Sequence, residues 1–322
     1  MDAESLHSIG IAWKGSPRLW GEIPLNLLPT CCAKGVVRSP EGKVLFTLKP
    51  KHEIARGSYG QIDAFYKNGE KETVVAVKRP RGSGNFLTEA LVQWYLGKRL
   101  SSYGISPCIP LVHDIFLFKP ENTIWFTMDI FKPLLFSQWC VQVLPSQPEL
   151  FPQIMVQLSI ILEVFQRDVL LDHRDLKVNN ILIVEEKTVM PITWESKETT
   201  ITFPFRIIIL DFGFACINAT VDVKDDLPKL DVCPKEGRDM FQLLVSLWNI
   251  PTLRRCLEST WGEWIRKALR SANGDSSAYV RLAEGIHPIH WMYSVTRDVA
   301  FTAPACSSSF ILSECMKRLS FS

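Results

Sequence analysis

The 322-residue sequence has no strong charge of either sign and no cysteine arrangement typical of a metal site. Its net charge of +2 gives no broad basic surface, so we expect neither nucleic acid nor a membrane surface as a partner. Its nine cysteines contain no CxxC spacing. This argues against a zinc site or a disulfide framework and predicts reduced thiols.

Targeting and membrane segments are also lacking. The N-terminal stretch MDAESLHSIG has neither the basic nor the apolar region of a signal peptide. No apolar run reaches the length of a membrane span, since even TIWFTMDIFKPLLF contains Asp129 and Lys132. These absences predict an intracellular, cytoplasmic protein without a membrane span.

The composition is that of a folded protein, with 47% hydrophobic and 22% charged residues. Residues 1–45 are rich in turn signals, and strand-like apolar runs follow, with one amphipathic helix over 86–100. Beyond residue 130, long helical patterns dominate and strands are short. We therefore expect an N-terminal extension (1–45), a β-rich domain (46–130) and a mainly helical domain (131–322).

A glycine-containing stretch, IARGSYGQI, lies between two predicted strands. Gly57 and Gly60 would let backbone N–H groups approach a phosphate with no side chain in the way. The alternative is a hairpin turn that needs positive φ angles, and the pattern alone does not exclude it.

An apolar strand, VVAVKRP, ends near a lysine that needs a partner. A buried ammonium group left unpaired costs several kcal/mol or shifts its pKa, so Lys78 requires a counter-charge. Glu89 on the predicted helix is the one acidic residue between Lys78 and His113. The two predict an ion pair; the alternative is an exposed lysine and a solvated glutamate.

Two further stretches carry residues suited to phosphate chemistry. In HRDLKVNN, Asp175 can accept a proton from a hydroxyl, Lys177 can neutralise a phosphoryl group, and Asn180 offers an oxygen to Mg²⁺. In IIILDFG, Asp211 directly follows a buried-type strand, where a carboxylate can bind a metal ion. The alternatives are a polar loop and a strand that ends in an Asp-x-Gly turn.

In order and spacing, these four segments resemble the signature set of eukaryotic-type protein kinases, over roughly residues 46–250. The resemblance implies an α+β, bilobal kinase-like fold with a small β-rich N-lobe, a larger, mainly helical C-lobe and ATP between them. Lys177 after Asp-Leu resembles the serine/threonine group more than the tyrosine group. Short, divergent chains of this kind resemble kinases of large DNA viruses, which would place the protein in the host cell cytoplasm.

The resemblance also implies roles for the motif residues. The loop with Gly57 and Gly60 would cover the phosphates. Lys78 would hold the α- and β-phosphates and pair with Glu89, and Asp175 would be the catalytic base.

The same resemblance implies a metal site and an adenine site. Asn180 and Asp211 would bind Mg²⁺, with Mn²⁺ as an alternative, and Asp239 would support the catalytic loop. The positions that would contact the nucleotide base or form the hinge are Ile54, Ile62, Ala76, Met128, Asp129 and Leu182.

The sequence departs from the family in three places, one of which is a short interval between Lys78 and Glu89. No Ala-Pro-Glu segment lies between Asp211 and Asp239, and the chain is reduced after residue 250.

We expect ATP-dependent transfer to serine or threonine hydroxyls of an unidentified protein substrate. Two alternatives stay open: a pseudokinase that binds nucleotide or a partner as a scaffold, and a kinase of small molecules. In the family, an arginine before the catalytic aspartate often pairs with a phosphorylated residue. Acidic residues after Asp211 suggest that a carboxylate, and not phosphorylated Thr220, pairs with Arg174 here; the alternative is a solvated acidic loop.

Overall fold

The protein divides into two compact units in a computed structural model. The first unit comprises residues up to Lys98 together with Ile109–Phe131, and the second comprises Arg99–Cys108 and the chain from Lys132 onward. The structure describes residues 25–70, 73–82, 86–105, 107–131, 134–194, 197–217, 221–222, 234–273, 295, 298 and 300–319.

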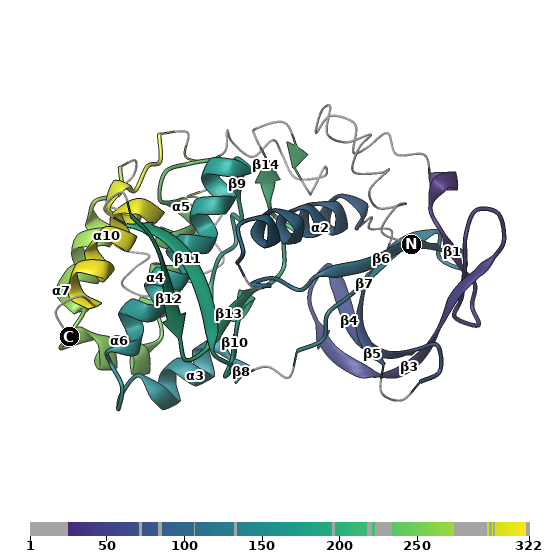
Figure 1. The fold of residues 1–322 in the computed structure, drawn as a ribbon, viewed down its shortest axis with the longest axis horizontal. Helices are drawn as coiled ribbons and strands as arrows, with labels where there is room; N and C mark the ends of the chain where they lie inside the picture. The colour runs from purple at the N-terminus through teal and green to yellow at the C-terminus, as the bar shows by residue number, and fades with distance from the viewer. Residues whose placement is uncertain are drawn as a thin grey trace. The chain divides into compact units, whose positions relative to one another are not determined.

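The first unit is a closed barrel of seven strands in the order β1-β2-β3-β4-β5-β7-β6 (Figure 1). Neighbouring strands are antiparallel except β1 and β6, which pair in parallel and close the barrel. One helix, α2 (Leu87–Ser102), follows β5. The strands are β1 (Thr30–Cys31), β2 (Val36–Arg38), β3 (Val44–Arg56), β4 (Gly60–Lys67), β5 (Val74–Pro80), β6 (Val112–Phe118) and β7 (Thr123–Met128).

Strand alternation separates two faces of this sheet. Phe65 lies opposite Val75 in the β4–β5 register, and both belong to the buried core together with Val77 and Trp125. Because side chains alternate along a strand, Lys78 on β5 points to the other face. The barrel therefore keeps an apolar interior while the outer face of β5 carries a lysine.

The predicted bilobal kinase-like fold is wrong. The first unit is a closed barrel because β1, which lies in the segment 1–45, pairs with β6 and leaves no open small sheet. The second unit combines its helices with several short sheets, so it has mixed α/β content and is not the mainly helical lobe expected. Local patterns predict strands, but long-range pairing decides which strand edges meet.

The second unit contains helices from separate parts of the chain: α3 (Phe136–Val143), α4 (Leu150–Glu163), α5 (Arg238–Trp248), α6 (Pro251–Glu258), α7 (Gly262–Arg270) and α10 (Ser308–Leu319). Its described strands form the sheets β13-β10-β8, β11-β12 and β15-β14-β9. The strands are β8 (Leu134–Leu135), β9 (Leu171–Asp172), β10 (Ile181–Val184), β11 (Thr188–Trp194), β12 (Lys197–Phe203), β13 (Arg206–Ile209), β14 (Cys216–Ile217) and β15 (Val221–Asp222).

Helix α4 forms the centre of this unit. Its sequence LFPQIMVQLSIILE is apolar on almost every side, and most of its side chains are buried, as expected for a helix surrounded by other elements. One π-helical turn, Val164–Asp168, continues it. Helix α5 starts after Gly237, where φ is 74° and a Cβ atom would lie 2.0 Å from the carbonyl oxygen of Ala303. Only glycine fits at this start.

The thiols and the helices bear on two sequence predictions. Cys216 is disulfide-bonded, contrary to the prediction of reduced thiols, whereas the other cysteines within the described ranges are free. Among the helices that the structure describes, none combines the length and the apolar character needed to cross a bilayer.

Candidate functional site

Lys78 and Glu89 form a buried ion pair in the first unit. The Lys78 ammonium on β5 bonds to the Glu89 carboxylate in the first turn of α2. The side chains are only 10% and 1% exposed, and the ammonium also lies 5.2 Å from the centre of the Phe86 ring. The predicted ion pair is therefore present, and the alternative of two solvated charges is wrong.

Several predicted adenine positions share the face of Lys78. Ile62 lies directly opposite Lys78, and Ala76 lies opposite both Ala64 and Met128. Cross-strand partners point to the same side, so Ile62, Ala76, Lys78 and Met128 line one face of β4, β5 and β7. This face combines small or apolar side chains with one ammonium group.

The other predicted adenine and hinge positions are placed differently. Ile54 lies where the β3–β4 register shifts, and its side chain is 41% exposed. The Asp129 carboxylate accepts the backbone N–H of Leu111 at 3.0 Å and contacts His113 Nε2 at 2.8 Å. Leu182 is buried in β10 of the second unit.

The loop between β3 and β4 closes through one backbone bond, from Gly57 N–H to the Gly60 carbonyl (2.9 Å). Neither glycine has a positive φ angle, so the hairpin does not need them for that reason. A Cβ atom on Gly60 would lie 2.7 Å from the Phe86 ring, whereas one on Gly57 would meet only the Gly60 carbonyl oxygen at 3.7 Å. A side chain at position 60 would thus have to displace the ring that flanks Lys78.

The loop after β9 brings Asp175, Lys177 and Asn180 together in the second unit. Lys177 Nζ contacts both carboxylate oxygens of Asp175, at 2.8 and 2.7 Å. Asn180 Nδ2 donates to the Asp175 backbone carbonyl at 2.8 Å and to Oδ2 at 3.0 Å. These contacts give the carboxylate one orientation.

Burial and the neighbouring lysine act in opposite directions on Asp175. Burial raises the pKa of its carboxyl group, and the Lys177 ammonium lowers it. Burial also lowers the pKa of His173, whose Nδ1 accepts the Asp175 N–H at 3.3 Å. Nδ1 is therefore unprotonated, and Nε2 carries the proton that it donates to the Leu210 carbonyl at 2.8 Å.

A buried carboxylate on α5 supports this loop. Asp239 accepts the backbone N–H groups of His173 and Arg174 at 2.8 and 2.9 Å. Burial and nearby Asp172 raise the pKa of Asp239 to about 7, while these N–H groups and Arg238 act in the opposite direction. Arg174 has φ = 63°, so the loop turns sharply just where Asp239 bonds to it.

A second buried contact near this loop, between Asp172 and Arg238, was not predicted from the sequence. Asp172 pairs with Arg238, and both side chains are fully buried. Asp172 also accepts the Lys235 N–H at 2.6 Å. The sequence did contain a signal for this pair: a charged residue directly precedes each of two motif residues. Asp172 precedes His173, and Arg238 precedes Asp239.

Asp211 follows β13 and adjoins the same loop. Its φ angle is 63°, and the preceding residue, Leu210, donates its N–H to the Asn180 carbonyl at 2.8 Å. The Asp211 charge raises the pKa values of both Asp175 and His173. Phe212 is buried, with its ring centre 5.0 Å from that of His173, and anchors this segment.

The donor chemistry fits a magnesium ion. Asn180 uses its amide nitrogen for Asp175, and its amide oxygen is the atom that would serve as a ligand. Asp211 is exposed and adds a carboxylate. Oxygen ligands of this kind are the ones Mg²⁺ prefers. Within the described ranges, no cluster of three or more His, Cys, Asp and Glu side chains is arranged for a metal ion. The predicted ligand pair, Asn180 and Asp211, contains only one residue of these four types and therefore could not form such a cluster.

The structure thus contains two groups of candidate residues, one in each unit: the Lys78 face with the glycine loop, and the loop that carries Asp175. Thr220 and Asp225, which bear on the predicted pairing of Arg174, lie outside the described residues. Comparison with models of protein families gave no match, and comparison with curated proteins gave none either.

Proposed function

We propose that this protein is a phosphotransferase of the protein-kinase type, which uses ATP and Mg²⁺ to phosphorylate serine or threonine hydroxyls of a protein substrate. The observation that carries the proposal is the Asp175 carboxylate, which Lys177 and Asn180 hold in one orientation. A polar loop with no catalytic task would not need to bury a carboxylate and bind both of its oxygens.

Each residue has a separate task in the proposed reaction. Asp175 accepts the proton of the substrate hydroxyl while the oxygen of that hydroxyl forms a bond to the γ-phosphorus of ATP. The bond between the γ-phosphorus and the oxygen that stays with ADP breaks. Lys177 offsets negative charge on the transferred group. Asn180 and Asp211 would hold the metal ion, which when bound neutralises phosphate charge. Lys78, oriented by Glu89, would bind the α- and β-phosphates.

Labelled phosphate transfer from Mg·ATP tests the proposal. The acceptors are the protein itself and generic proteins, and the variant is Asp175→Asn. We expect the variant to lose roughly 10²- to 10⁴-fold in rate, the usual contribution of a general base, while it still binds ATP. Glu186→Gln is a matched control, since Glu186 is an exposed acidic residue in the same unit whose carboxylate bonds to Arg206.

The other outcomes separate the alternatives. A protein that binds ATP but transfers no phosphate with any metal ion or acceptor would be a scaffold. Transfer to small hydroxyl compounds but not to proteins would indicate a small-molecule kinase. Undiminished transfer by Asp175→Asn would refute the assigned base.

A further inference from the structure

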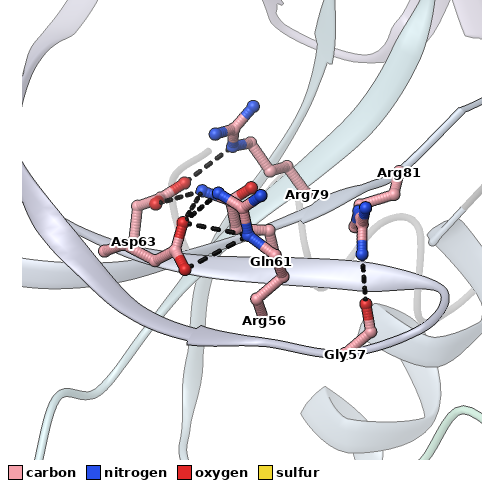
Figure 2. A network of polar contacts seen from close by, with 7 residues as sticks. Arg56, Gly57, Gln61, Asp63, Arg79 and Arg81 are labelled. Carbon is pink, nitrogen blue, oxygen red and sulfur yellow. Dashed lines mark hydrogen bonds and ion pairs between the residues drawn. The ribbon is translucent and has the colours of Figure 1, made fainter.

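Arg81, directly after β5, contacts the glycine loop at two points. Its backbone N–H donates to the Tyr59 carbonyl at 2.9 Å. Its guanidinium Nη1 donates to the Gly57 carbonyl at 3.0 Å, as the dashed line in Figure 2 shows. One residue therefore binds two of the carbonyl groups in the loop between β3 and β4.

These two contacts orient the backbone N–H groups of the loop. The peptide bond is planar and trans, so a carbonyl and the N–H of the next residue point in opposite directions. With the carbonyls of Gly57 and Tyr59 directed at Arg81, the N–H groups of Ser58 and Gly60 are directed away from it. A loop used to bind phosphate needs N–H groups on its ligand side and carbonyls on the other.

The charge of Arg81 differs from that of its neighbours. Arg56 bonds to Glu53, and Arg79 bonds to Asp63, so carboxylates offset both of these guanidinium groups (Figure 2). Among the residues that the structure describes, Arg81 makes no ion pair, and its contacts are with backbone carbonyls. Its positive charge is therefore available to a bound anion.

We propose that Arg81 is the positioning residue of the glycine loop. It turns two carbonyls away from the phosphates of a bound nucleotide, presents the Ser58 and Gly60 N–H groups to them and adds a positive charge behind the loop. This inference rests on the proposed function, because it concerns the same nucleotide.

The test compares binding of Mg·ATP with binding of adenosine, which has no phosphate, in the full chain by calorimetry. Arg81→Ala should weaken Mg·ATP binding by roughly ten- to a hundredfold, the effect of a lost hydrogen bond that involves a charged group, and leave adenosine binding unchanged. Arg81→Lys should recover part of the loss, because lysine keeps the charge and one donor. In transfer assays, KM for ATP should rise more than kcat falls.

Arg56→Ala is the matched control. Arg56 lies at the same hairpin but bonds to Glu53 and to no loop carbonyl, so ATP affinity should stay unchanged. An equal loss of ATP and adenosine affinity in Arg81→Ala would mean a collapsed loop and would overturn the positioning role. Unchanged ATP affinity in Arg81→Ala would overturn it too, with the proposed function intact. A wild type that binds no Mg·ATP would overturn both.

Discussion

The two units hold their candidate residues by different means. In the first unit, Lys78 is oriented by its ion pair with Glu89 and by the strand that carries it. In the second unit, the loop around Asp175 is held by the Asp239 carboxylate, which accepts the backbone N–H groups of His173 and Arg174.

This difference has an energetic consequence. A buried ion pair can often be replaced by apolar side chains without loss of stability, because the cost of desolvating two charges disappears with the pair. A carboxylate that accepts buried N–H groups cannot be replaced in this way, since the donors remain and lose their acceptor. The Lys78–Glu89 pair should thus tolerate paired substitution by apolar residues, whereas Asp239 should not tolerate an apolar replacement.

Removal of Asp239 should have the largest effect. Asp239→Ala leaves two buried N–H groups without an acceptor, and we expect a loss of about 3–5 kcal/mol in the free energy of unfolding. Denaturant titration measures this loss. Asp239→Asn keeps one acceptor oxygen and should lose clearly less. Equal losses in the two variants would mean that the backbone contacts do not carry the effect.

Separation of the Lys78–Glu89 pair should come next. Lys78→Met removes the ammonium that pairs with the buried Glu89 carboxylate and should cost about 3 kcal/mol, whereas Lys78→Met with Glu89→Leu should recover most of this stability. Phosphate transfer should remain lost in both proteins, since the ammonium is missing. The contrast between the units fails if the double variant is as unstable as the single one.

The two loop glycines provide a smaller, local contrast. Gly60→Ala forces the Phe86 ring to move, which should cost about 1–3 kcal/mol and weaken ATP binding. Gly57→Ala meets only an ordinary contact and should change stability little. Thermal unfolding and calorimetry distinguish them, and a larger loss at Gly57 would contradict the geometry.

The smallest expected effect is a shift in pH dependence. Asp175 acts as a base only when ionised, and burial raises its pKa, so activity should fall on the acid side at a higher pH than for an exposed aspartate. Lys177→Ala removes the charge that lowers this pKa, and the acid limb should move to still higher pH. A pH profile of kcat/KM measures the shift; a limb that moves to lower pH would exclude this coupling.

Much of the local structure could be predicted from the chain. The apolar run in VVAVKRP indicated the strand that ends near Lys78, and IIILDFG indicated the buried strand β13. The pairing of Lys78 with Glu89 followed from the scarcity of other acids nearby. These predictions succeeded because strand periodicity and charge balance act over short stretches.

The sequence by itself thus determined several strands, some of the helices and the residue types available for phosphate chemistry. Only the tertiary structure decided that β1 pairs with β6 to close a barrel, that Asp172 meets Arg238, and that Arg81 binds the glycine loop. These are contacts between segments far apart in the chain or between a side chain and a particular backbone carbonyl. Such contacts depend on the position of every element at once, so no local pattern encodes them.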